Sequence, residues 1–186
     1  MIQRVRTIKH LTVLTNDPSM TAWGWAVLKD NKVIDCGCIK TEPDHKKKRI
    51  RKSDDTLRRV SEINKELLRI IEKYEVYYIV SEAPHGSQNA QAAVMVGMVA
   101  GILQTMADLL NKPIEWFSEM ESKKALLGKK SASKTETVKA IKNIFPEIHY
   151  KNVKYHDEAV ADAVSVYYCA CKLSTLLKVI LDDVPH

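Results

Sequence analysis

Several features of fibrous, membrane-embedded and secreted proteins are missing from this sequence. Six glycines and six prolines among 186 residues are too few for a collagen-like or low-complexity chain. The longest apolar run, about Ala92 to Leu103, is shorter than the roughly 20 residues that cross a bilayer. The first ten residues include Arg4, Arg6 and Lys9 but lack the apolar block and cleavage site of a secretory signal. These absences predict a globular, cytoplasmic protein with no membrane partner.

Cysteine is scarce, and its spacing does not suit a metal or redox motif. The four cysteines form two pairs, Cys36 with Cys38 and Cys169 with Cys171, each separated by one residue. Zinc knuckles and dithiol redox motifs use a spacer of two residues. We therefore expect reduced thiols in the core, as is usual for free cysteine.

Hydrophobic periodicity predicts three consecutive strands and then alternating helices and strands. The predicted strands are His10–Asn16, Thr21–Lys29, Lys32–Thr41, Val76–Val80 and Ile114–Phe117. The predicted helices are Asp54–Tyr74, Asn89–Leu110, Glu121–Leu127, Ser133–Ile144 and Glu158–Leu181. This order predicts an α/β fold that resembles the ribonuclease H-like arrangement, a mixed five-stranded sheet flanked by helices. The chain length fits one domain covering residues 1–186.

Basic residues outnumber acidic ones and gather in two stretches. Lys and Arg total 29 against 23 Asp and Glu, which gives a net charge of +6. The first stretch is a candidate arm for contacting phosphates, although a solvated linker explains its charge equally well. It contains Lys46, Lys47, Lys48, Arg49, Arg51, Lys52, Arg58 and Arg59, and the weaker second group contains Lys123, Lys124, Lys129, Lys130 and Lys134. The charge permits a polyanionic partner without establishing one.

Four acidic residues stand where a carboxylate costs desolvation energy unless a cation holds it. Asp17 and Glu82 follow predicted strands, while Glu158 and Asp162 lie four residues apart on one face of the last helix. Asp157 points well away from Asp162. Considered one at a time, these acids also have ordinary structural explanations. Asp17 could be a turn residue, Glu82 could be an acid that leads into a helix, and Asp157 could be a helix N-cap. Together the four acids fit the oxygen ligands of Mg²⁺, and metals held in this way support phosphodiester hydrolysis.

The segment from Asp17 resembles the first-strand motif of RuvC-type Holliday-junction resolvases, in which a catalytic Asp-Pro-Gly precedes a Thr-Gly pair. Glu82 is similar to the catalytic Glu of that family, and the helix after it to the helix of the dimer interface. A later lysine-bearing segment is similar to one that contacts DNA. The matching segments are Asp17 to Val27, Glu82, Asn89 to Ala93 with Gly97, Lys123 to Gly128, and Ala132 to Lys134. The resemblance spans about Val13 to Val166.

The sequence also departs from the family pattern. Ser19 replaces the usual Gly, and His85 replaces an aromatic residue that stacks on a base, which predicts weak sequence preference at the cut. The last two acids of the family usually lie three apart, so the fourth ligand here is either Glu158 or Asp157, and helix geometry favours Glu158. The N-terminal ten residues and the basic stretch are longer or more basic than in bacterial members. This indicates a divergent, phage-encoded branch, in a bacterial or phage-infected cell.

The resemblance implies a homodimeric endonuclease that nicks branched DNA, above all four-way junctions, with Mg²⁺ or alternatively Mn²⁺. Asp17, Glu82, Glu158 and Asp162 are then the catalytic metal ligands. The implied DNA contacts are Lys46, Lys47, Lys48, Arg49, His85, Lys123, Lys130 and Lys134. Two alternatives stand beside this hypothesis. One is a monomeric ribonuclease H-like nuclease acting on flaps or RNA–DNA hybrids, and the other is a non-catalytic nucleic-acid-binding module that has lost the metal.

Overall fold

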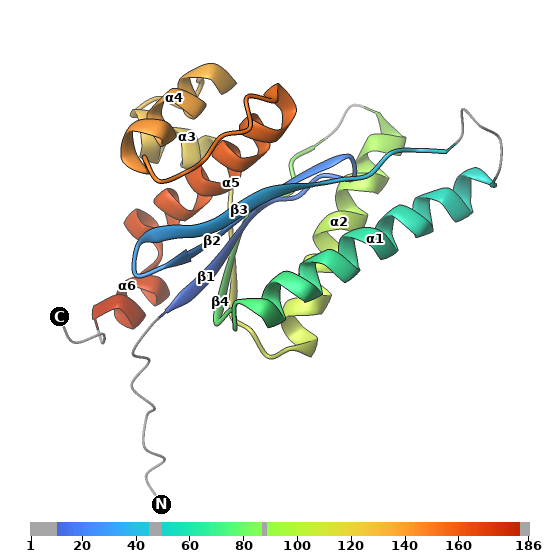
Figure 1. Ribbon diagram of the computed structural model, residues 1–186, viewed down its shortest axis with the longest axis horizontal. Coiled ribbons are helices and arrows are strands. Elements are labelled where there is room, and N and C mark those ends of the chain that lie inside the picture. The colour runs from blue at the N-terminus through green and yellow to red at the C-terminus, as the bar shows by residue number, and fades with distance from the viewer. Residues whose placement is uncertain (1–10, 45–49, 87–88, 183–186) are drawn as a thin grey trace, which may run out of the picture.

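The computed structural model describes residues 11–44, 50–86 and 89–182, which form a five-stranded mixed sheet with helices on both faces (Figure 1). The strands are β1 (Thr12–Asp17), β2 (Ala22–Lys29), β3 (Lys32–Lys40), β4 (Tyr78–Glu82) and β5 (Ile114–Phe117). Their order across the sheet is β3-β2-β1-β4-β5, with β1, β2 and β3 antiparallel and β1, β4 and β5 parallel. The predicted α/β fold class is therefore confirmed.

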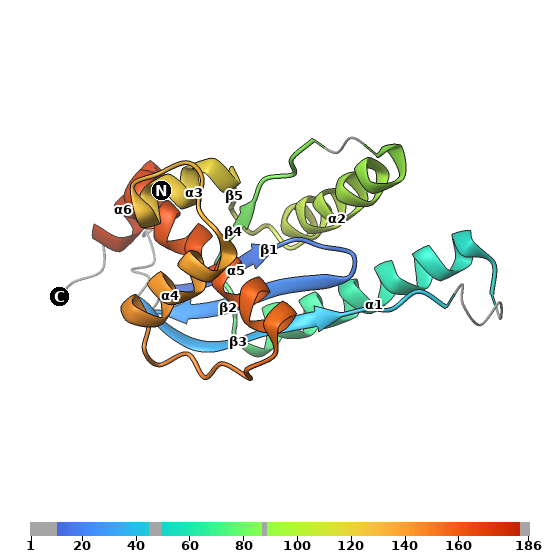
Figure 2. The same cartoon turned by 90° about the horizontal axis from the view of Figure 1, so that it is seen from above.

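Six helices are present in the described part of the chain, in two layers. They are α1 (Lys52–Lys73), α2 (Ala90–Leu109), α3 (Glu119–Leu127), α4 (Lys134–Ile144), α5 (Lys154–Leu173) and α6 (Thr175–Asp182). Helices α1 and α2 cover one face of the sheet, and α3 to α6 gather on the other (Figures 1 and 2). Because successive strand residues point to opposite faces, Leu14 and Val27 pack toward α1 while Val13 and Leu28 pack toward α5.

The ends of several elements differ from the prediction. Strands β1 and β4 extend through Asp17 and Glu82, so each acid is the last residue of its strand and does not follow it. The predicted last helix is two helices. Ser174 is extended, with φ −68° and ψ 125°, and its hydroxyl accepts a hydrogen bond from the amide of Leu177 at 2.8 Å. Such a serine cap ends α5 and starts α6.

Helix α2 is longer and less covered than the apolar run suggested. It continues past Gln104, and it is the one helix within the described ranges that is long and apolar enough to cross a membrane. The prediction that this segment is too short was therefore wrong, although length and composition of one helix are weak evidence for a span. Only 17% of its apolar stretch is buried, so much of α2 presents apolar surface outward.

Candidate active site

The ends of two neighbouring parallel strands bring Asp17 and Glu82 to one edge of the sheet. Strands β1 and β4 pair with Asn16 opposite Ser81, so the next residue on each strand is one of the two acids. Both strands are buried up to this point because helices cover both faces of the sheet. The strand pattern thus places two carboxylates at the carboxyl edge, as the sequence predicted.

Asn16 ties these strand ends together from behind. Its side chain is fully buried, its amide nitrogen donates to the carbonyl oxygen of Val80 at 3.3 Å, and its amide oxygen accepts from the indole of Trp23 at 3.1 Å. An indole N–H only donates and a backbone carbonyl only accepts, so the two contacts fix the orientation of the amide. They link β1 to β2 and β4 directly beside the acids.

Helix α5 lies directly against the sheet beside Asp17. Gly24 on β2 pairs with Asp17, and a Cβ atom at Gly24 would lie 2.0 Å from the carbonyl oxygen of Ala159. The hydroxyl of Thr15 donates to the carbonyl oxygen of Ala163 at 2.5 Å. Ala159 directly follows Glu158, and Ala163 directly follows Asp162, the two acids predicted on this helix. The two contacts therefore set how closely those acids approach the strand ends.

All four favoured acids line one cavity of about 390 Å³. Its walls come from the ends of β1 and β4, the start of β2, and helices α3, α4 and α5. They are formed by Asp17, Pro18, Ser19, Ala22, Glu82, His85, Glu119, Lys134, Tyr155, Glu158, Ala159 and Asp162. The joint placement that the sequence suggested is thus present in the folded chain.

Asp157 lies apart from this cavity and has structural partners of its own. One carboxylate oxygen accepts the backbone amide of Lys151 at 3.0 Å and lies 3.2 Å from Nδ1 of His156. Helix α5 begins at Lys154, so Asp157 is in its first turn and is not the cap that the sequence allowed. Of the two candidates for a fourth ligand, the geometry favours Glu158.

Glu119 joins the acidic cavity although the sequence analysis overlooked it. It is the first residue of α3, two positions after β5 ends. Strand β5 runs parallel to β4, so its carboxyl end reaches the same edge as Glu82. Glu119 also pairs with Lys123 at 2.5 Å. The strand-end argument that found Asp17 and Glu82 could have found this acid too.

Burial and mutual repulsion raise the pKa values of the clustered carboxyl groups. For Asp17 and Glu82, burial is the larger cause and the charges of neighbouring acids add to it. Burial also raises the pKa of Asp162, against the opposing charge of Lys134, whose ammonium lies 3.2 Å from the carboxylate. Burial is the largest single influence on the pKa of Lys134 and acts to lower it. The charge and hydrogen bond of Asp162, together with the charges of Asp17 and Glu158, outweigh burial and raise that pKa. The site therefore carries more negative charge than its own cations neutralise.

The structure assigns different surroundings to the predicted DNA-contacting residues. Lys134 and Lys123 pair with Asp162 and Glu119 at the acidic cavity, whereas Lys130 is exposed. The predicted contacts Lys46, Lys47, Lys48 and Arg49 lie outside the described residues.

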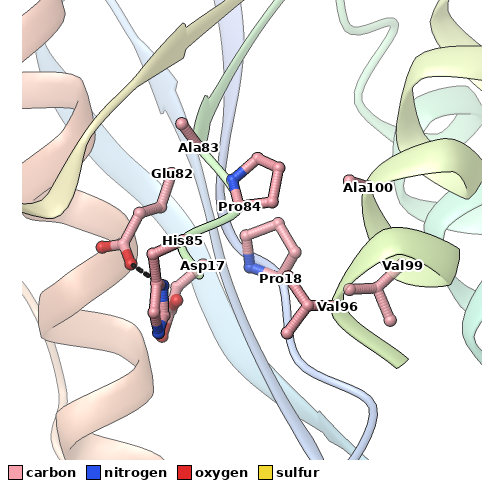
Figure 3. A pocket seen from close by; sticks show the side chains of 9 residues that line it. All are labelled: Asp17, Pro18, Glu82, Ala83, Pro84, His85, Val96, Val99 and Ala100. Atoms are coloured by element: carbon pink, nitrogen blue, oxygen red, sulfur yellow. Dashed lines mark ion pairs between the residues drawn. The ribbon is translucent and has the colours of Figure 1, made fainter. Parts of the chain in front are cut away.

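His85 lies over the acids at the mouth of a smaller crevice of about 30 Å³ (Figure 3). Its Nδ1 is 4.0 Å from a carboxylate oxygen of Glu82, and 70% of its side chain is exposed. Pro18 and Pro84 separate the two acids from Val96 on α2. His85 is thus open to a ligand that enters the cavity.

Comparison with known proteins identifies the family. Residues 13–170 match the family described as crossover junction endodeoxyribonuclease RuvC. The chain belongs to the RuvC family. RuvC of Pseudothermotoga lettingae is 26% identical over 166 residues, which cover 87% of this chain and 94% of the relative. RuvC of Ehrlichia ruminantium is 27% identical over 167 residues, covering 86% and 95%.

Solved structures of a RuvC protein and of a yeast resolvase share the fold. T. thermophilus RuvC in complex with a Holliday junction substrate superposes with a TM-score of 0.68 at 20% identity, covering 87% of this chain and 93% of that one. The yeast mitochondrial Holliday junction resolvase gives a TM-score of 0.58 at 16% identity, covering 90% and 80%. These structures show the shared fold, and the family match over residues 13–170 confirms the RuvC resemblance inferred from the residues.

The donor set of this RuvC-family cavity fits a hard divalent cation. Its acids offer only oxygen, which Mg²⁺ prefers. Across the described ranges, no three Asp, Glu, His or Cys side chains already meet around one point. Like charges approach closely only around a cation. Such an ion would offset the burial and the repulsion between acids that raise the pKa values of Asp17 and Glu82.

Proposed function

We propose that this protein is a structure-selective endodeoxyribonuclease that cleaves four-way DNA junctions by hydrolysing phosphodiester bonds with Mg²⁺. One observation carries the proposal: Asp17, Glu82, Glu158 and Asp162 line a single cavity in a chain of the RuvC family. Mn²⁺ prefers similar oxygen ligands and is the alternative ion. We place the enzyme in the cytoplasm of a bacterial or phage-infected cell, as one nuclease domain over residues 1–186.

In the proposed mechanism, the four acids hold the metal. A bound Mg²⁺ would supply positive charge that favours ionisation of a water and stabilises the departing 3′ oxygen. Asn16 keeps the acids in place through its contacts with β4 and β2, and Gly24 and Thr15 do so through their contacts with α5. Lys134 balances part of the charge on Asp162 and lies where a phosphate enters, so its ammonium can contact substrate as well.

A panel of substrates tests the proposal and both alternatives. The protein would be incubated in Mg²⁺ with a four-way junction, a replication fork, a flap, an RNA–DNA hybrid and linear duplex. We expect paired, symmetric nicks in the four-way junction. Preferential cutting of flaps or hybrids by a monomer would favour the general nuclease, and binding without any cutting would favour the non-catalytic module.

We further propose that a second copy of the chain covers the outward surface of α2. A groove of about 630 Å³ runs between α1 and α2 and is lined largely by apolar or small residues, among them Leu68, Gly101, Ile102, Met106 and Leu109. Leu109 is 77% exposed. Apolar patches of this kind mark interaction sites. Symmetric cleavage of a four-way junction needs two active sites, which a two-fold dimer supplies.

Replacing Gly97 with leucine is expected to weaken self-association without unfolding the chain. A Cβ atom at Gly97 has open space around it, so the bulky side chain would obstruct the partner and not the fold. Sedimentation at micromolar concentration should show a dimer that the substitution shifts toward monomer. Gly86→Leu is the matched control, because its Cβ space is also open and it lies outside α2. An unmodified protein that is monomeric, or that floats with lipid vesicles, would contradict the dimer.

Replacing Gly24 with alanine should instead disturb the site from within the fold. The added methyl group meets the backbone of Ala159, so α5 must move. We expect a loss of about 1–3 kcal/mol in the free energy of unfolding, as for other overpacked sites, and slower cleavage at temperatures where the variant is still folded. Urea unfolding measures the stability, and single-turnover assays measure the cleavage rate. Gly86→Ala is the control, because a Cβ atom at Gly86 has open space around it. Unchanged stability would show that α5 does not pack here as described.

A further inference from the structure

A half-exposed tyrosine stands at the rim of the acidic cavity without a role in metal binding. Tyr155 lines the cavity and is 45% exposed. It lies three residues before Glu158 on α5, and positions three and four apart share a helix face. Tyr155 therefore continues the row of Glu158 and Asp162 toward solvent. An aromatic ring in this position offers a flat apolar surface directly beside the acids.

Lys40 from β3 defines the surroundings of this ring. Its ammonium lies 5.0 Å from the ring centroid, a distance at which a cation is attracted to an aromatic face. Lys40 also pairs with Glu42 at 2.7 Å. In the sheet, Lys40 is opposite Ala22, which itself lines the cavity, so the lysine stands at the same end of the sheet as Asp17. Two segments far apart in the sequence thus place a ring and a cation together at the rim.

The charges around Tyr155 suit a nucleotide better than an apolar ligand. The cavity floor is acidic, so a DNA strand that reaches it needs cations on either side for its phosphates. Lys40 supplies one such cation beside the ring, and Lys151 and Lys154, which closely precede Tyr155 in the chain, are exposed. Every nucleobase has a π-face, and a base stacks on an aromatic side chain largely without regard to sequence.

We propose that Tyr155 stacks on a nucleobase beside the cleaved phosphodiester, while Lys40 exchanges Glu42 for a neighbouring phosphate. This inference rests on the proposed nuclease function and adds a binding subsite to it. The ligand is an unpaired nucleotide of the strand being cut. Because stacking tolerates any base, the subsite would hold the strand without selecting its sequence.

Fluorescence of 2-aminopurine tests the stacking directly. The base analogue would be placed at each nucleotide flanking the mapped cut in a static four-way junction, with binding measured in Ca²⁺. We expect quenching at one position with the unmodified protein and with Tyr155→Phe, which keeps the ring. Tyr155→Leu should lose the quenching and bind roughly 5- to 100-fold more weakly, the range typical of one stacked base. Tyr77→Leu is the control. Tyr77 is 40% exposed, and it directly precedes the first residue of β4, whereas Glu82 at the acidic cavity is the last residue of that strand.

The outcomes separate this inference from the function on which it rests. An unmodified protein that cuts no junction would overturn both. If the unmodified protein cuts the junction, and Tyr155→Leu shows the same quenching and affinity, the stacking proposal is refuted while the proposed nuclease function stands. Equal losses in Tyr155→Phe and Tyr155→Leu would assign the effect to the hydroxyl and also refute stacking. Thermal unfolding of each variant confirms that the comparison is made between folded proteins.

Discussion

The Asp17→Asn variant is expected to bind four-way junctions within several-fold of the unmodified protein and to cleave them at least about 100-fold more slowly. Loss of a partner that only supports a metal ligand already costs roughly 10- to 100-fold, so loss of a ligand itself should cost more. Binding should survive because cationic side chains supply the phosphate contacts. Single-turnover cleavage in Mg²⁺ and affinity in Ca²⁺ measure the two effects. Full cleavage by Asp17→Asn would refute the proposed site.

Stability gives an independent measurement on the same variant. Burial and the charge of Asp162 raise the pKa of Asp17 from 3.8 to about 7, so the folded protein binds this proton more tightly than the unfolded chain does. The associated stability is fully present below the unfolded pKa and is lost as pH rises through the folded pKa. In the absence of metal, Asp17→Asn should therefore be the more stable protein at pH 8, with the difference disappearing toward pH 4. Saturating Mg²⁺ should raise the unfolding temperature of the unmodified protein more than that of the variant.

The sequence predicted the parts of the site that depend on local pattern. Asp17 and Glu82 end two apolar runs, and the carboxyl ends of parallel strands meet at one edge of a sheet, so their proximity followed from the strand order. The spacing of Glu158 and Asp162 fixed a shared helix face in the same way. The predicted strands Thr21–Lys29 and Lys32–Thr41 left two residues between them, and these residues, Asp30 and Asn31, adopt the positive φ of a short hairpin.

Features that depend on packing between distant elements were not predictable in this way. Nothing local in the sequence indicates that Lys134 at the start of α4 pairs with Asp162 on α5, because that pairing depends on how the two helices pack. The contact between Gly24 and Ala159 likewise joins segments more than a hundred residues apart. The break at Ser174 did carry a local signal, a serine cap before an apolar helix, but the continuous apolar periodicity concealed it.

Adjacent acids on α5 provide the sharpest test of the fourth ligand. Glu158→Gln and Asp157→Asn make the same chemical change at neighbouring positions, one facing the cavity and the other turned away. An asparagine at 157 still has an oxygen to accept the amide of Lys151, so we expect that variant to cleave junctions nearly as fast as the unmodified protein.

Glu158→Gln replaces a charged ligand with a neutral one. Loss of a residue that only supports a metal ligand costs roughly 10- to 100-fold, so this variant should slow single-turnover cleavage by at least that much. Higher Mg²⁺ should restore part of its rate, because a weakened site fills at higher metal concentration. Affinity for the junction in Ca²⁺ checks that both variants still bind DNA. If Asp157→Asn were the slower enzyme, α5 would have to rotate in the DNA complex so that Asp157, and not Glu158, faces the metal.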